Sequence, residues 1–193
     1  MRHVAIQRVA AAERRIRQFE RNDSTNHSYR EFLRFFDGVE PITAHHVTVG
    51  AYFAYGWMPR ILAKFEVAKL DEIVAIVNNA KNGAFPTGKQ LTCLICSINN
   101  SLVGPSKLLH FVNPKKVAIW DSRVFRFMEG RSPYYHDMTS VQNYLDYHRN
   151  LRELVNDQQF TDVHSSLNNK IGYAVSPMRA CEYIMYLNGN GND

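Results

Sequence analysis

The apolar residues of this chain recur mainly at spacings of three and four, which is the period of an amphipathic helix. In residues 4–21, Ile6, Val9, Ile16 and Phe19 share one face and several arginines occupy the other. Similar stretches follow, separated by short polar breaks, and few stretches alternate as strands do. The pattern predicts an all-α fold, with helices at about residues 4–21, 28–36, 43–55, 70–80, 88–99, 106–112, 122–129, 139–156 and 177–188.

Start and stop signals set these boundaries. Thr43 and Thr139 are placed to cap helices, and Ser176-Pro177 begins the last one. The 193 residues suffice for a single compact helical unit, or for two lobes, that buries roughly 70% of its unfolded surface. Residues 189–193 are rich in Gly and Asn and are expected to form a frayed tail.

A Gly-Pro pair precedes the helix predicted over Ser106–Val112. Gly104 permits an unusual backbone conformation, and Pro105 suits the first position of a helix. The N–H groups at such a helix start have no partner within the helix, so they form a ready site for a phosphate. Asn113-Pro114 then ends the helix.

The next segment, Val117–Trp120, is predicted to be a buried extended strap. Asp121 follows it at the N-cap of the helix Ser122–Glu129, where the helix N–H groups hold the carboxylate and the helix dipole keeps it ionised. Four cations lie close to this aspartate in the sequence: Lys115, Lys116, Arg123 and Arg126.

These two segments resemble the helix-hairpin-helix DNA glycosylases, which include the endonuclease III, adenine-mismatch and 8-oxoguanine glycosylases. The family's hairpin reads roughly L-P-G-V-G-x-K/S-T-A, and a V-D-x-H-V-x-R-V segment with the catalytic aspartate follows. Leu102-Val103-Gly104 is similar to the hairpin, and residues 119–126, Ile-Trp-Asp-Ser-Arg-Val-Phe-Arg, are similar to the aspartate segment. The first glycine of the hairpin is missing, and the helix between the two segments is about one turn shorter than in the family.

The resemblance implies a two-lobed helical fold, with a helix-hairpin-helix motif at about 88–112, an aspartate segment at 117–129 and an interlobe cleft. It implies an enzyme that flips a damaged or modified base out of double-stranded DNA and cleaves its N-glycosidic bond, leaving an abasic site. Such an activity would serve DNA repair or defence against phage with modified DNA. The sequence does not indicate which base is removed.

The same resemblance assigns roles to residues. Asp121 would stabilise the oxocarbenium-like sugar as the base leaves. Ser106 occupies the column that holds lysine in bifunctional members; Lys107, one residue later, is a candidate Schiff-base nucleophile, so lyase activity stays open. The candidate DNA-binding residues are Gly104, Ser106, Lys107, Lys115, Lys116 and Arg123. The candidate aromatic walls of a base pocket are Trp120, Tyr52, Tyr55 and Trp57.

Other interpretations account for the same residues. Asp121 can be a plain helix cap, in which case the chain is a non-catalytic helix-hairpin-helix DNA-binding module. A helical toxin or interaction protein that binds no nucleic acid is also compatible with the composition. Aromatic residues at helical spacing are more often core than ligand contacts, and the histidines His45, His46 and His110 are expected in core or capping positions.

Charge and cysteine content narrow the partners. The 23 Lys and Arg residues against 18 Asp and Glu give a net charge of +5, which suits a polyanion such as DNA. Three cysteines cannot hold the four-cysteine iron–sulfur cluster of some family members, and no zinc spacing occurs, so we expect no cofactor. Cys93 and Cys96 are expected to be buried core thiols. We further expect a cytoplasmic monomer that does not associate with membranes.

Overall fold

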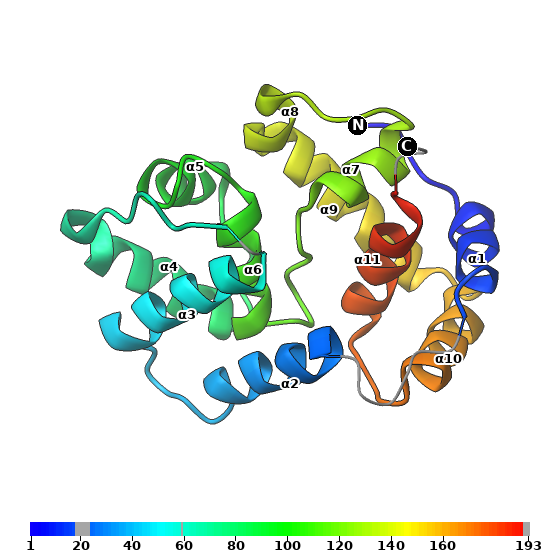
Figure 1. Ribbon diagram of the computed structural model, residues 1–193, viewed down its shortest axis with the longest axis horizontal. Helices are drawn as coiled ribbons and strands as arrows, with labels where there is room; N and C mark the ends of the chain where they lie inside the picture. The colour runs from blue at the N-terminus through cyan, green and yellow to red at the C-terminus, as the bar shows by residue number, and fades with distance from the viewer. Residues whose placement is uncertain (18–23, 59, 191–193) are drawn as a thin grey trace. The chain divides into compact units, whose positions relative to one another are not determined.

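The computed structural model of the chain describes residues 1–17, 24–58 and 60–190. These residues form eleven α-helices and one short 3-10 helix, and no strand occurs among them (Figure 1). The extended residues Phe65 and Ile98 pair through an isolated antiparallel bridge. The all-α class predicted from the apolar spacing is confirmed.

The chain divides into two compact units. One unit is Ser24–Val117, and the other combines the described residues that precede and follow it. The boundary falls within the buried strap 117–120, so this strap contributes residues to both units.

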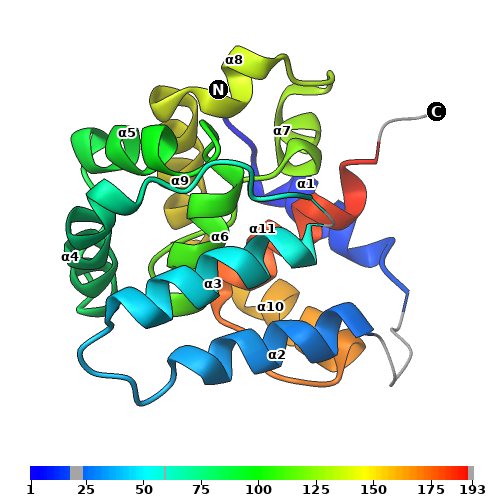
Figure 2. The same ribbon diagram turned by 60° about the vertical axis from the view of Figure 1, so that its left-hand side comes forward.

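The unit Ser24–Val117 is built around α3 (Ala44–Trp57). Its other elements are α2 (Ser24–Phe36), the 3-10 helix η1 (Val67–Lys69), α4 (Leu70–Lys81), α5 (Gly88–Ser97) and α6 (Val103–Val112). α3 contacts α2, α4 and α6 (Figure 2). Gly50 allows this close packing, because a Cβ atom there would lie 2.6 Å from the Phe36 ring and 2.8 Å from the Leu108 side chain.

The second unit is built around α11 (Pro177–Asn188). Its other helices are α1 (Ile6–Arg14), α7 (Ser122–Glu129), α8 (Tyr135–Thr139), α9 (Val141–Asn156) and α10 (Phe160–Ile171). α11 contacts α1, α7, α9 and α10 (Figure 1). Its residues from Met178 to Met185 are all buried, as expected for a helix enclosed by others.

Most helix starts read from local signals are confirmed. The backbone N–H of Thr43 donates to Nδ1 of His46 at the start of α3 (3.2 Å), which makes this histidine a capping residue. Thr87 and Gln90 form a capping box before α5, with Gln90 N to Thr87 Oγ1 at 3.3 Å and Thr87 N to Gln90 Oε1 at 2.8 Å. Ser176 caps α11 by accepting from the backbone N–H of Arg179 (3.1 Å).

Three boundaries in the first half of the chain differ from the prediction. α1 ends at Arg14, and the predicted end of this helix, residues 18–21, lies outside the described residues. α2 begins at Ser24 instead of Ser28, and the Ser28 hydroxyl donates to the Ser24 carbonyl (2.8 Å) within its first turns. α5 ends at Ser97 instead of Asn99, since Ile98 is extended and pairs with Phe65.

Around the start of α9, Ser140 caps the helix instead of Thr139. The backbone N–H of Asn143 donates to the Ser140 hydroxyl (3.1 Å). Thr139 ends α8, a short helix that is not among the predicted ones. Asp137 fixes this helix start by accepting from the backbone N–H of Tyr134 (2.8 Å), a contact that the Pro- and Tyr-rich composition does not reveal.

The helix α10 is missing from the predicted elements. Its buried residues Phe160, Val163, Leu167 and Ile171 recur at spacings of three and four, so the pattern that predicts the other helices is also present here. Polar residues separate these apolar positions, so the segment resembles a loop between two helices unless the apolar spacing is counted.

The prediction of two buried thiols at Cys93 and Cys96 is wrong. Cys96 is exposed and Cys93 is half-buried, because Leu91 and Leu94 occupy the inward face of α5. Burial is the main factor that raises the pKa of the Cys93 thiol. The third cysteine, Cys181, is fully buried in α11.

Candidate functional site

The turn between α5 and α6 contains two asparagines. Asn99 and Asn100 have φ angles of 55° and 50°, in the left-handed region that asparagine tolerates better than other non-glycine residues. The Asn99 side chain accepts from the backbone N–H of Lys64 (2.7 Å) and donates to the Ile61 carbonyl (2.8 Å). These bonds fix the turn against the extended segment that precedes η1.

The Gly-Pro pair suggested an unusual backbone conformation at Gly104, but the residue does not adopt one. α6 begins at Val103, three residues earlier than predicted, so Gly104 and Pro105 lie in its first turn, where a missing N–H costs no helix bond. The glycine is required by packing instead. A Cβ atom at position 104 would lie 2.5 Å from the hydroxyl oxygen of Tyr55 and nearer still to its ring.

The start of α6 offers fewer backbone donors than its sequence suggested. The N–H of Val103 donates to the Ser101 hydroxyl (3.2 Å), and the N–H of Ser106 donates to the Leu102 carbonyl (2.9 Å). Ser106 is buried, and its hydroxyl donates to the Val103 carbonyl (2.9 Å). Within the described residues, Gly104 keeps the one N–H of this turn with no backbone or side-chain acceptor.

Lys107 lies on α6 with only 6% of its surface exposed. Its Nζ is 5.3 Å from the ring centroid of Trp57, a cation–π distance. Trp57 is half-buried in a cluster of aromatic rings with Tyr29, Phe32 and Phe111. The Nζ of Lys107 thus lies over an aromatic ring of its own unit.

The other candidates of this unit are more exposed. Lys115 and Lys116 lie at the surface after the end of α6, and Tyr52 is 56% exposed. Tyr55 is buried beneath Gly104, and burial raises the pKa of its hydroxyl to about 12. The aromatic candidates Tyr52, Tyr55 and Trp57 all belong to α3, so three of the four proposed pocket walls come from one helix.

His110 holds the first residue of the strap. Its Nδ1 lies 2.6 Å from the Val117 carbonyl, and its Nε2 lies 2.9 Å from the Tyr29 hydroxyl. A carbonyl can only accept, so Nδ1 carries the proton and Nε2 accepts from the tyrosine. His110 is fully buried and is a core histidine, as expected.

In the second unit, two buried tyrosines of α9 hold the strap. The hydroxyl of Tyr144 donates to the Ala118 carbonyl, and that of Tyr147 donates to the Ile119 carbonyl, each at 2.9 Å. Burial raises the pKa of both tyrosines well above its usual value, so both remain protonated donors. The strap is buried and extended, as predicted from its apolar residues.

Trp120 is fully buried, and its indole N–H donates to the Met138 carbonyl (3.2 Å). Its ring packs against those of Phe125, Tyr144 and Tyr147. Trp120 is therefore part of the hydrophobic core of its unit.

Asp121 caps α7, as predicted. Its Oδ1 accepts from the backbone N–H of Arg123 (2.9 Å), and its carbonyl accepts from that of Phe125 (3.0 Å). The side chain is half-buried. The start of α7 thus fixes one carboxylate oxygen of Asp121. The strap directly before it is held by hydrogen bonds that α9 donates to two of its carbonyls.

The end of α11 packs against the start of α7. Gly189 is buried against the backbone of Arg123, and its carbonyl accepts from Nε of Arg126 (2.8 Å). The Arg123 guanidinium stacks on the ring of Tyr186 at 4.8 Å. Gly189, which was expected to begin a frayed tail, is a packed residue; residues 191–193 lie outside the described part of the chain.

Two ion pairs of this unit were not predicted from the sequence. Arg179 and Glu182 pair within α11, with 3% and 1% of their surfaces exposed. Arg131 donates to both carboxylate oxygens of Asp137 (2.8 and 3.1 Å), and this bond holds the pKa of Asp137 at about 2. The i,i+3 spacing of the first pair was visible in the sequence, but its burial depends on the helices packed around α11.

The candidate residues are distributed over both units. Asp121, Trp120 and Arg123 belong to one, whereas Lys107 and the remaining candidates belong to the other. Among the described residues, no three His, Cys, Asp or Glu side chains cluster as metal ligands would. In the same residues, no helix has the length and apolar character needed to span a membrane.

Comparisons of the chain with protein-family models, with curated proteins and with solved structures find no match.

Proposed function

We propose that this protein is a DNA N-glycosylase in which Asp121 is the catalytic carboxylate. The observation that carries the proposal is the way Asp121 is held: its Oδ1 is fixed at the start of α7, and the preceding backbone is anchored by Tyr144 and Tyr147. A carboxylate held in this way needs no reorganisation when positive charge develops beside it. Together with the resemblance of residues 119–126 to the aspartate segment, this favours a glycosylase.

The reaction would proceed in a simple order. As the C1′–N bond of the flipped nucleotide breaks, the bonding electrons leave with the base and the sugar becomes oxocarbenium-like. The Asp121 carboxylate stabilises this charge and orients a water molecule. The water oxygen then bonds to C1′, its proton compensates the charge of the departing base, and an abasic site remains. The candidate substrates are duplexes with a damaged or modified base, including phage-type modifications.

Lys107 is the candidate for additional lyase chemistry, but its surroundings favour a monofunctional enzyme. Its ammonium group lies over Trp57, and the residue in the family's lysine column is the buried Ser106. A role in binding phosphate or in packing fits this position better than a nucleophilic role. The helix-hairpin-helix motif would correspond to α5, the Asn99-Asn100 turn and α6, with Gly104 supplying the backbone N–H to a phosphate.

A second candidate function is a non-catalytic DNA-binding module. The observation that favours it is that the bond from Arg123 N to Asp121 Oδ1 is an ordinary helix cap. In that case the charge of Asp121 has no chemical role, and its neutral amide would serve equally well.

The variant Asp121→Asn separates the two functions. Asparagine caps helices about as well as aspartate, so the fold should stay within roughly 1 kcal/mol of the original protein. Single-turnover release of a base, followed by mass spectrometry on duplexes with oxidised, alkylated and phage-type modified bases, should fall by about a hundredfold or more in this variant. DNA binding should persist.

Asp157→Asn is a matched control. Asp157 lies three residues before α10, and its Oδ1 accepts from the backbone N–H of Gln159 (2.8 Å), the same bond to the second following residue that Asp121 forms with Arg123. This variant should leave base release unchanged. If both variants retain full release, the catalytic role of Asp121 is refuted. If the wild-type protein binds these duplexes but releases no base from any of them, the glycosylase is refuted and the binding module takes its place.

A further inference from the structure

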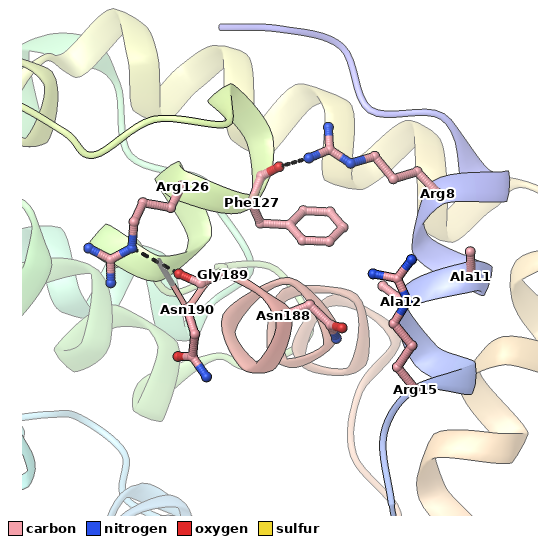
Figure 3. A pocket seen from close by; sticks show the side chains of 9 residues that line it. All are labelled: Arg8, Ala11, Ala12, Arg15, Arg126, Phe127, Asn188, Gly189 and Asn190. Carbon is pink, nitrogen blue, oxygen red and sulfur yellow. Dashed lines mark hydrogen bonds between the residues drawn. The ribbon is translucent and has the colours of Figure 1, made fainter. Parts of the chain in front are cut away.

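A cavity of about 230 Å³ lies in the unit that carries Asp121. α1 forms one wall, and the last turn of α7 with the end of α11 forms the other (Figure 3). Arg8 and Arg15 extend from α1, whereas Arg126 and Asn188–Asn190 lie across from them, with the Phe127 ring between (Figure 3). Ala11 and Ala12 complete the wall on α1, and their small side chains leave the space open.

The lining carries three positive charges and no carboxylate. Arginine stays protonated at any physiological pH. Within the described residues, none of Arg8, Arg15 and Arg126 forms an ion pair with an acidic side chain. The lining therefore carries a net positive charge, which an anion in the cavity would neutralise.

Two of the arginines are held in place by main-chain carbonyls. Arg8 donates to the Phe127 carbonyl and lies 4.6 Å from the centroid of that residue's ring. Arg126 donates through Nε to the Gly189 carbonyl (2.8 Å). A guanidinium group has five N–H donors, so each keeps donors for a further acceptor after these bonds are made.

Arg15 differs from the other two. It is exposed, it lies just after the last residue of α1, and its side chain has no hydrogen-bond or ion-pair acceptor among the described residues. The neighbouring Arg14 and Arg17 are also exposed, so the cavity opens beside a basic surface. Side-chain amides at Asn188 and Asn190 add neutral donors.

We propose that this cavity binds a backbone phosphate of a nucleic-acid strand, with Arg15 as the principal ligand and Arg8 and Arg126 as supporting ligands. Arginine forks match the geometry of phosphate oxygens, and the net charge of +5 fits a polyanionic partner. This choice of partner rests on the proposed function. It adds a DNA contact on α1 and α11 to the contacts expected from the hairpin.

The test uses the full chain with Arg15→Ala, because Arg15 supports no other residue. Binding to duplex DNA is measured as a function of salt concentration. Loss of one phosphate contact should make the log–log slope shallower by about 0.9. Arg14→Ala is the matched control: it removes the same charge from α1, but Arg14 donates to the Ala10 carbonyl (3.3 Å) and lies outside the cavity lining, so its slope should stay near that of the wild type.

A second variant, Ala11→Glu, keeps all three arginines and places a carboxylate where the phosphate would bind. Glutamate is well tolerated in helices. This variant should reduce the slope as Arg15→Ala does. Titration with inorganic phosphate, followed through the NMR signals of the Gly189 and Asn190 amides, should shift these signals in the wild type and in Arg14→Ala, but not in Ala11→Glu.

The outcomes are distinguishable. Unchanged slopes and unchanged phosphate shifts in both cavity variants overturn the site, and loss of phosphate shifts with unchanged DNA slopes overturns the nucleic-acid source in favour of a small phosphate ligand. A reduced salt-dependence slope in both cavity variants, without any base release by the wild type, would support the phosphate site and reject the glycosylase. Base release that depends on Asp121, with unchanged slopes in both cavity variants, would support the glycosylase and reject the phosphate site.

Discussion

The substitution Gly189→Ala should be strongly destabilising, because it pushes apart two helices at the candidate site. An added Cβ atom would lie 2.5 Å from the carbonyl carbon of Arg123, 3.0 Å from its Cα and nearer still to its oxygen. These are backbone atoms of α7, so no side chain can rotate away. Overpacking typically costs about 1–3 kcal/mol, and a clash with backbone falls at the upper end. At ~2–4 °C per kcal/mol for a chain of this size, the melting temperature should fall by roughly 6–12 °C.

Two other glycines provide controls for this measurement. Gly172→Ala meets no atom within 4 Å, but the residue has a φ of 79°, and a left-handed alanine costs about 1 kcal/mol. Gly56→Ala, in α3, also meets no atom and should be neutral or stabilising, since alanine is the better helix former. Thermal melting by circular dichroism should therefore rank Gly189→Ala as the least stable of the three. A melting temperature within about 2 °C of the wild type would refute the packing of α11 on α7.

Two further predictions concern pH and strand cleavage. The bond to Arg131 lowers the pKa of Asp137 from 3.8 to about 2. The ion pair therefore stabilises the fold above pH 3.8, and this stability is lost as the pH falls to about 2. Asp137→Asn should flatten the fall in melting temperature across this pH window, and an unchanged acid profile would contradict the assignment. The proposed monofunctional enzyme should leave an abasic strand that breaks only on alkali treatment, and a borohydride-trapped adduct that is lost in Lys107→Ala would instead establish a lyase.

Features that depend on neighbours along the chain could be predicted from the sequence. The Thr43 start, the Ser176-Pro177 start and the Asp121 cap all involve partners two or three residues away, and the structure contains each of them. The all-α class could be predicted for the same reason, because the apolar period of a helix is visible within a few turns of sequence. Even α10, which the prediction omitted, carries this signal in its apolar spacing.

Contacts between residues far apart in the sequence could not be predicted in this way, because they depend on the tertiary structure. Gly104 looked like a residue with special backbone conformation, but it is a glycine because the Tyr55 side chain lies against it. The backbone of Arg123 requires a glycine at position 189 in the same way, and Arg15 and Arg126 line one cavity although more than a hundred residues separate them. Side-chain burial and charge proximity depend on how helices pack, and no local pattern encodes that packing.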